Sequence, residues 1–261
     1  MIDLSFSMND LEYFLMILVR VASFVFISPF FSMRNVPARV RVALSVFVAL
    51  LLYQAVTPAE ALVYETELEY AILVIKEAIA GLLIGFGANI CMSILNFAGS
   101  IVDMEIGLSM AQLMDPNSLE MTSLTGVFYQ YVFTMMMIAT GMYRYLLGAL
   151  ADTFVLIPIG GIVFQREKML ETIVQFLSDY IIIGFRIVLP VFCVILLLNA
   201  ILGVLAKVSP QMNMFAIGIQ LKILTGFGVL FLTVQMLPGA AEFIFTEMKT
   251  VIASFVEAIS P

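Results

Sequence analysis

The chain has 261 residues, of which 62% are hydrophobic and 12% are charged, and its formal net charge is -7. Soluble domains are roughly 45–50% apolar and about 25% charged, so this composition excludes an ordinary soluble fold and predicts an all-α, multi-helix integral membrane protein. The negative balance argues against nucleic acid as a partner, because phosphate binding needs clustered Lys and Arg. The chain contains no His, which excludes His-based metal sites and Ser-His or Cys-His pairs. We therefore predict no catalytic residue, cofactor or metal.

The apolar residues fall into runs that predict about six main helices. Four runs reach the roughly 20 residues that a bilayer-crossing helix needs, and two are shorter. In chain order they are Leu11 to Phe31, Val42 to Val56, Ala71 to Ala98, Leu124 to Leu147, Ile173 to Leu198 and Leu221 to Leu237. No polar or low-complexity linker separates them, which predicts one domain over residues 1–261.

The charges around the first helices give a partial topology. Asp3, Asp10 and Glu12 precede the first run where a signal peptide would be positive, so we expect the first helix to be retained. The arginines of residues 33–41 place that loop in the cytoplasm by the positive-inside rule. If every helix crossed the membrane in turn, Arg166 would lie on the side away from the cytoplasm. This simple topology therefore explains the charges only in part.

Lys76, Glu77, Asp179 and Arg186 are charged residues that lie within the long apolar runs. Lys76 and Glu77 are adjacent and diverge by about 100° around a helix, which predicts partners on other helices rather than each other. Asp179 and Arg186 are seven residues apart and project from nearly one face, toward protein or water. Charges at membrane depth are costly. Two readings stay open: structural interhelical ion pairs, or a direct role in transport.

The segment Asn96 to Glu120 contains the most unusual pattern. Gly99, Asp103 and Gly107 recur every four residues, so one carboxylate lies between two bare backbone positions where another chain could pack closely. Asp115-Pro116 fits an N-cap followed by proline at the first helical position, which predicts a new helix there. The Met-rich residues Gly107 to Met114 are then either a plain elbow or a functional loop.

A second unusual connection runs from Asn199 to Lys222. Its polar residues between apolar ones predict non-helical backbone that is buried in protein or lines a cavity. The two cysteines, Cys91 and Cys193, lie far apart in apolar runs, which predicts buried free thiols.

These two segments resemble motifs of the FliR family. The resemblance extends over nearly the whole chain through Arg20 with Pro29, VPARVRV at Val36 to Val42, and Gly141 followed by Phe154, Pro158 and Gly160. The matching residues are Gly99, Asp103, Gly107 and Asp115-Pro116 in the central motif, and Asn199, Gly203, Pro210-Gln211, Asn213, Phe215 and Gly218 in the C-terminal motif. The chain departs from the family at Gln220, where many relatives have proline, and at Tyr143-Arg144, which replaces a segment that often contains His.

The resemblance implies a subunit of a membrane-embedded gate built from FliP, FliQ and one FliR. It implies a FliP-like N-terminal part, a FliQ-like C-terminal part, and a place in the flagellar basal body at the bacterial cytoplasmic (inner) membrane. Unfolded flagellar proteins would cross through this gate, other export-apparatus membrane proteins would adjoin it, and the chain itself would catalyse no reaction.

The resemblance also implies roles for particular residues. The pore plug would be Gly107, Leu108, Ser109, Met110, Ala111, Gln112, Leu113 and Met114. Subunit packing or gating would involve Gly99, Asp103, Asp115, Pro116, Asn199, Gly203, Pro210, Gln211, Asn213 and Gly218, and intramembrane charge contacts would involve Lys76, Glu77, Asp179 and Arg186.

Two alternatives remain at this point. One is an injectisome homologue of the SctT type, which shares the architecture and would export virulence effectors. The other is a self-sufficient secondary transporter of a small solute, with Asp103, Asp179 and Arg186 as ion or substrate sites near the bilayer midplane.

Overall fold

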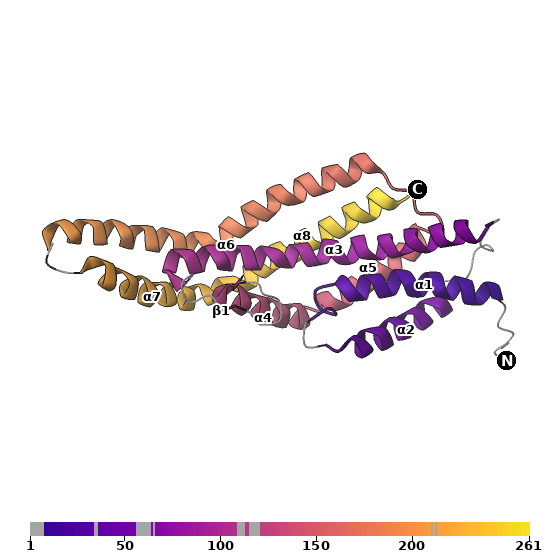
Figure 1. The fold of residues 1–261 in the computed structure, drawn as a ribbon, viewed down its shortest axis with the longest axis horizontal. Helices are drawn as coiled ribbons and strands as arrows, with labels where there is room; N and C mark the ends of the chain where they lie inside the picture. Colours follow the sequence, from indigo (N-terminus) through magenta and orange to yellow (C-terminus); the bar gives the residue numbers. More distant parts are fainter. Residues whose placement is uncertain are drawn as a thin grey trace. The chain divides into compact units, whose positions relative to one another are not determined.

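Long helices carry almost all of the described chain (Figure 1). The computed structural model describes residues 8–33, 36–55, 64, 66–108, 113–114, 121–209, 211 and 213–261. Its α-helices are α1 Met8–Ile27, α2 Ala38–Ala55, α3 Glu67–Ile106, α4 Leu124–Ala139, α5 Met142–Leu156, α6 Arg166–Val208, α7 Met214–Thr233 and α8 Leu237–Ile259. The short 3-10 helix η2, Val234–Met236, joins α7 to α8. The predicted all-α, multi-helix class is confirmed.

Four stretches are long and apolar enough to cross a membrane: Ala38–Ala55, Glu67–Ile106, Arg166–Val208 and Ala216–Ile259. The last of these combines α7, η2 and α8. With 40 residues, α3 is about 60 Å long, which is about twice the hydrocarbon thickness of a bilayer. Part of α3 therefore extends beyond a membrane core unless the helix is strongly tilted.

The predicted run Leu124 to Leu147 is two helices rather than one. The chain turns at Thr140 and Gly141, where Gly141 has a φ of 72°. This left-handed conformation costs little only for glycine, so α4 ends and α5 begins at this point. Hydrophobicity alone does not reveal this break between the helices, because the segments on both sides of it are apolar.

The predicted non-helical connection from Asn199 to Lys222 is wrong for most of its length. Residues 199–208 continue α6, and residues 214–222 begin α7. The sequence ILGVLAKV contains no breaker stronger than one glycine, so the helical hydrogen bonds persist up to Ser209, whose amide donates to the Leu205 carbonyl. Only residues 209–213 connect the two helices.

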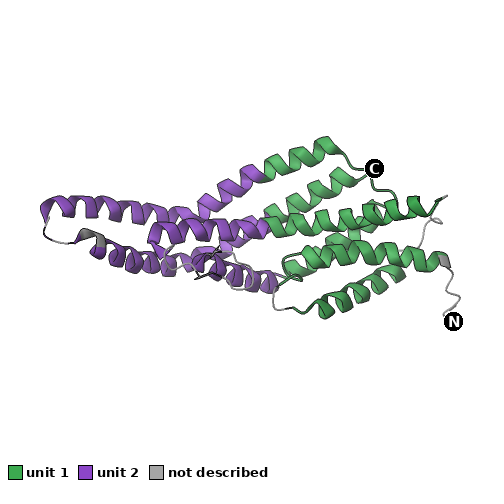
Figure 2. Ribbon diagram, viewed as in Figure 1, with its two compact units in different colours: residues 1–90, 141–176, 247–261 green, residues 91–140, 177–246 purple. Residues whose placement is uncertain are grey.

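The chain forms two compact units, coloured separately in Figure 2. Unit 1 comprises residues 1–90, 141–176 and 247–261, and unit 2 comprises residues 91–140 and 177–246. The core of unit 1 includes Ile17 and Phe24 of α1, Ile84 of α3 and Leu150 of α5. The prediction of one domain over residues 1–261 stays a prediction.

The core of unit 2 joins α3 to α6. Ala98, Val102 and Ile106 of α3 pack with Val188, Val191 and Ile195 of α6 in one buried cluster. A Cβ at Gly226 of α7 would lie 2.5 Å from Cγ1 of Ile106, so a bare glycine lets α7 approach the same cluster. Unit 2 thus holds the C-terminal end of α3 between α6 and α7.

Candidate functional site

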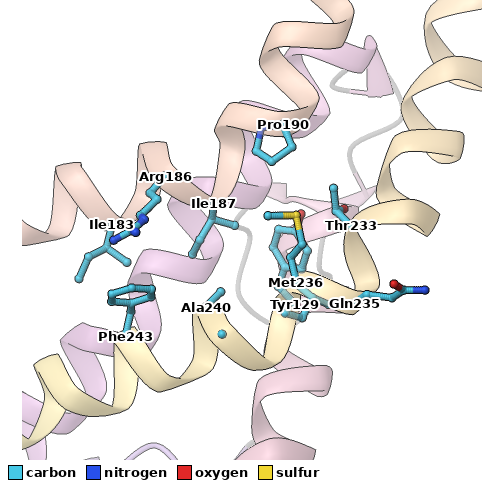
Figure 3. Close-up of a pocket in the computed structure, with 12 residues that line it drawn as sticks. Tyr129, Ile183, Arg186, Ile187, Pro190, Thr233, Gln235, Met236, Ala240 and Phe243 are labelled. Atoms are coloured by element: carbon cyan, nitrogen blue, oxygen red, sulfur yellow. The ribbon is translucent and has the colours of Figure 1, made fainter.

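Arg186 on α6 and Phe243 on α8 meet in unit 2. The guanidinium carbon lies 4.1 Å from the centre of the phenyl ring, a cation–π contact, and Figure 3 shows the side chain reaching toward that ring. The two residues border a cavity of about 370 Å³ that is also lined by Tyr129, Ile187 and Met236. Arg186 therefore faces protein on one side, as predicted. Asp179 is half-buried.

A buried ion pair joins α1 to α3 in unit 1. Nε of Arg20 donates to Oε2 of Glu77 at 2.5 Å, and the two side chains are 1% and 0% exposed. The prediction that Glu77 meets a partner on another helix is confirmed. Lys76 is half-buried, and it has no ion pair within the part of the chain that the structure describes.

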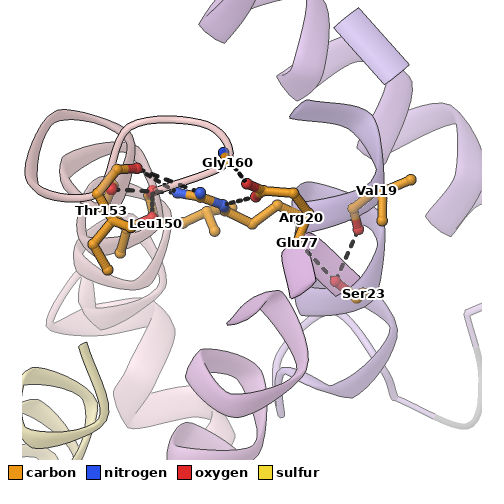
Figure 4. A network of polar contacts seen from close by, with 8 residues as sticks. Val19, Arg20, Ser23, Glu77, Leu150, Thr153 and Gly160 are labelled. Atoms are coloured by element: carbon orange, nitrogen blue, oxygen red, sulfur yellow. Dashed lines mark hydrogen bonds and ion pairs between the residues drawn. The ribbon is translucent and has the colours of Figure 1, made fainter. Parts of the chain in front are cut away.

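The same arginine also binds the C-terminal end of α5 (Figure 4). Its Nη1 donates to the carbonyls of Thr153 and Ile157, each at 3.3 Å, and its Nη2 donates to Ile157 at 3.4 Å. The Thr153 carbonyl also accepts from the Ile157 amide at 2.9 Å. The helix dipole is negative at this end of α5, so a cation is well placed there. The ring of Phe154 lies 4.3 Å from the guanidinium carbon.

Gly160 completes this network from the loop after α5. Its amide donates to Oε1 of Glu77 at 3.0 Å, and its φ of 82° suits glycine. Arg20, Phe154 and Gly160 were separate family matches in the sequence, and the structure brings them together around Glu77. Sequence reasoning missed this cluster as a site, although an arginine inside an apolar helix is the signal that it needs an acidic partner.

Asp103 is the centre of a second buried polar cluster, in unit 2. Its carboxylate is 1% exposed and accepts from Oγ of Ser123 at 2.6 Å, from the Thr125 hydroxyl, and from the Thr125 amide at 3.3 Å. Ser123 is also the N-cap of α4, since its Oγ accepts from the Gly126 amide at 2.9 Å. One carboxylate thus ties the end of α3 to the start of α4.

The close-packing position at Gly99, one helical turn before Asp103, is filled by another segment of the same chain. A Cβ at Gly99 would collide with the backbone nitrogen and Cα of Gly126. The close approach that we expected on this face therefore occurs between α3 and α4. A role of Gly99 and Asp103 in contacts with other subunits stays a prediction.

The predicted loop starts where α3 ends. Gly107 has a φ of 90°, and its amide donates to the Asp103 carbonyl at 3.0 Å. Leu108 packs against the core cluster of unit 2. Leu113–Met114 form the short strand β1, which pairs in antiparallel register with β2, Met121–Thr122. The start at Gly107 is thus confirmed, and the plug role of Gly107 to Met114 stays a prediction.

Parts of the predicted site lie outside the described residues. These are the middle of the loop, Ser109, Met110, Ala111 and Gln112, together with Asp115, Pro116 and Pro210. A helix that starts at Asp115-Pro116 is therefore untested. The described helix that follows the loop begins at Leu124.

The C-terminal motif lies around the turn between α6 and α7. Asn199 and Gly203 are exposed on α6, and Gln211 is exposed in the turn. Asn213 is the N-cap of α7, since its Oδ1 accepts from the Ala216 amide at 3.3 Å. Gly218 is buried, and a Cβ there would lie 3.5 Å from Cδ1 of Leu202. The motif therefore shapes a hairpin.

Neither Cys91 nor Cys193, both described residues, forms a disulfide, as predicted, but only Cys91 is buried. The prediction that Cys193 is buried is wrong, because the face of α6 that carries it points away from the core of unit 2. In the described residues there is no group of three or more Cys, Asp or Glu side chains that could hold a metal ion.

The sequence was also compared with known proteins. The family described as Bacterial export proteins, family 1, matches residues 11–248. Flagellar biosynthetic protein FliR of Bacillus subtilis is 29% identical over 226 residues, which are 86% of this chain and 86% of that protein. The protein of the same name from Escherichia coli is 25% identical over 93% of this chain and 92% of that protein. The one from Aquifex aeolicus is 25% identical over 92% of each chain.

Proposed function

Because the chain belongs to the family of bacterial export proteins, family 1, we propose that it is a FliR-type subunit of a flagellar protein-export gate. The match over residues 11–248 carries this proposal, and relatives named as flagellar FliR cover most of the chain's length. Unfolded flagellar proteins would cross the bacterial cytoplasmic membrane through the gate, within the flagellar basal body. The flagellar names of these relatives favour flagellar cargo over virulence effectors.

The exposed surface supports assembly within a membrane. Large apolar side chains on α6 and α7 are mostly exposed, for example Val208 at 72%, Leu224 at 72% and Phe231 at 78%. Large apolar side chains that are exposed to this extent need lipid or protein to cover them. FliP and FliQ are the partners that the family resemblance suggests, with other export-apparatus membrane proteins beside them.

The chain would act as a passive gate and catalyse no reaction. The buried acids serve the scaffold, because Glu77 is bound by Arg20 and by the Gly160 amide, and Asp103 by Ser123 and Thr125. The oxygens of both carboxylates are thus engaged in holding the chain's own segments together. This use of Asp103 also weighs against a solute transporter that relies on it.

We assign the pore plug to Gly107 to Met114. The segment is held at both ends: Asp103 fixes the stem between α3 and α4, and β1 pairs with β2. A segment held at both ends that carries the adaptable side chains of Met110 and Met114 can close around varied chains without displacing the helices. The plug therefore needs no rearrangement of the scaffold to open.

Co-expression with FliP and FliQ tests the proposal. Gentle detergent extraction and native mass measurement should yield a hetero-oligomer that contains one copy of this chain. Expression of the chain in a FliR-deficient flagellate should restore swimming. A monodisperse single chain that transports a small solute alone in liposomes, and that restores no motility, would contradict it.

A further inference from the structure

The cavity beside Arg186 lies at the edge of an uncharged layer. On α6, the twenty residues 187–206 between Arg186 and Lys207 carry no charge. On the returning stretch, residues 223–241 between Lys222 and Glu242 carry none either. Twenty helical residues span about 30 Å, which is the thickness of a bilayer's hydrocarbon core. Since Arg186 contacts Phe243, next to Glu242, the two stretches share this boundary.

Arg186 has free hydrogen-bonding capacity at this boundary. Its guanidinium is exposed and stacks by one face on Phe243, which leaves its N–H groups at the edge of the plane available. Within the described residues the Arg186 guanidinium takes part in no ion pair. Arginine's planar fork matches phosphate oxygens, and stacking on an aromatic ring orients it.

The rest of the cavity is suited to a hydrocarbon chain. Ile183, Ile187, Met236 and Ala240 line it beside Arg186, as Figure 3 shows. Pro190 in α6 and the 3-10 turn η2 interrupt the two walls, which leaves space between helices that would otherwise pack closely. About 370 Å³ is enough for part of an acyl chain but not for a whole lipid.

We propose that this cavity is a phospholipid site, in which Arg186 binds the phosphodiester at the head-group level and the cavity takes part of one acyl chain. A cation at the end of an apolar stretch, an oriented guanidinium and an adjoining apolar cavity together fit an amphiphilic anion. A segment of a partner protein fits less well, because an acidic side chain at this depth would have to be desolvated as well.

The test uses the assembled gate with a photoactivatable phosphatidylglycerol whose acyl chain carries a diazirine. After irradiation, labelled peptides from this chain are mapped by mass spectrometry. We expect label on residues 183–190 and 233–243. Arg186→Gln should lower the label roughly tenfold, because a charge-assisted hydrogen bond to phosphate is worth about that factor in affinity. Arg186→Lys should retain an intermediate level.

Two further variants separate specific binding from general attraction. Lys207→Gln removes the same charge from the other end of the uncharged stretch of α6, outside the cavity, and should leave the label unchanged. Ala240→Phe fills the cavity without removing the cation and should lower the label. Inorganic phosphate should compete weakly, because it gains nothing from the apolar cavity; strong competition would show a simple anion site and overturn the proposal.

Label is counted per assembled complex by native mass, so a variant that assembles poorly is still measured on the complexes that form. Equal label in wild type, Arg186→Gln and Ala240→Phe would overturn the proposal. So would a cross-link from an Ala240 photoprobe to another protein subunit in place of lipid. Neither outcome affects the export-gate assignment, which depends on assembly and motility.

Discussion

Removing one partner of the Arg20–Glu77 pair should destabilise unit 1 more than removing both. Glu77→Met leaves the Arg20 guanidinium buried without its counter-charge, and it leaves the Gly160 amide without its acceptor. Arg20→Met leaves the Glu77 carboxylate without its counter-charge and removes the side-chain donor from the end carbonyls of α5. The double variant removes both charges and puts two apolar side chains of suitable length in their place.

The magnitude follows from burial. Breaking a buried ion pair by removing one side typically costs about 3–5 kcal/mol, whereas replacing both charges with apolar residues is often close to neutral. In the double variant the Ile157 carbonyl would still lose its side-chain donor, at roughly 1–3 kcal/mol, whereas the Thr153 carbonyl keeps the Ile157 amide as a donor. Each single variant should therefore melt lower by on the order of 10 °C, and the double variant by less than either.

The assay is thermal loss of helical circular dichroism in mild detergent, for both single variants and the double variant. Lys76→Met is the matched control, because this neighbouring cation on α3 is half-buried and has no ion pair in the described residues. It should melt close to wild type. Two results would contradict this prediction. One is that both single variants melt at the temperature of Lys76→Met, and the other is that the fall in melting temperature of the double variant equals the sum of the falls in the two single variants.

The remaining predictions concern unit 2 and its loop. Asp103→Ala should impair assembly and swimming, because the buried donors of Ser123 and Thr125 lose their acceptor at about 1–3 kcal/mol; complex yield and soft-agar motility measure this. Gly99→Val should abolish assembly, because its side chain would collide with the backbone of α4, as native gels would show. Two nested deletions within residues 107–114 should raise ion conductance of the gate in planar bilayers while complex yield stays normal, because the plug is lost and the scaffold is not.

Each of these predictions has a matched control or a contrary outcome. Gly148→Ala, at a helix position where an added Cβ meets nothing within 4 Å, should assemble normally and shows whether any glycine change is harmful. Normal yield and motility in Asp103→Ala would make that carboxylate incidental. Unchanged conductance with intact assembly in both deletions would remove the plug assignment.

Local patterns in the sequence predicted much of the fold. The apolar runs predicted where α1, α2, α3 and α6 lie. The runs of α1, α3 and α6 reach the roughly 20 residues that a bilayer-crossing helix needs, and that of α2 is shorter. The spacing of Gly99, Asp103 and Gly107 predicted a helix face open to close approach, and Gly99 does lie against the backbone of α4. The family resemblance implied a loop from Gly107, and α3 ends at Ile106. These features depend on helix geometry within a few turns.

Long-range contacts could not be predicted in the same way. The break at Gly141 depends on one backbone torsion between two apolar segments. The continuation of α6 past Asn199 was obscured by polar residues that are tolerated on an exposed face. The partners of Arg20 are 57, 133 and 137 positions along the chain, so no local period reveals them.

The distance along the sequence between Arg20 and its partners sets the order in which they are synthesised at the ribosome. At about 5–20 residues per second, the Ile157 carbonyl that accepts from Arg20 is made roughly 7–30 s after Arg20 itself. During this interval the arginine lacks part of its final coordination, and a bare arginine in hydrocarbon costs about 2.5–3.5 kcal/mol on insertion scales. The guanidinium must meanwhile keep water, a lipid phosphate or an insertion factor beside it. The first helix is therefore among the last to become fully settled, although it is the first to be synthesised.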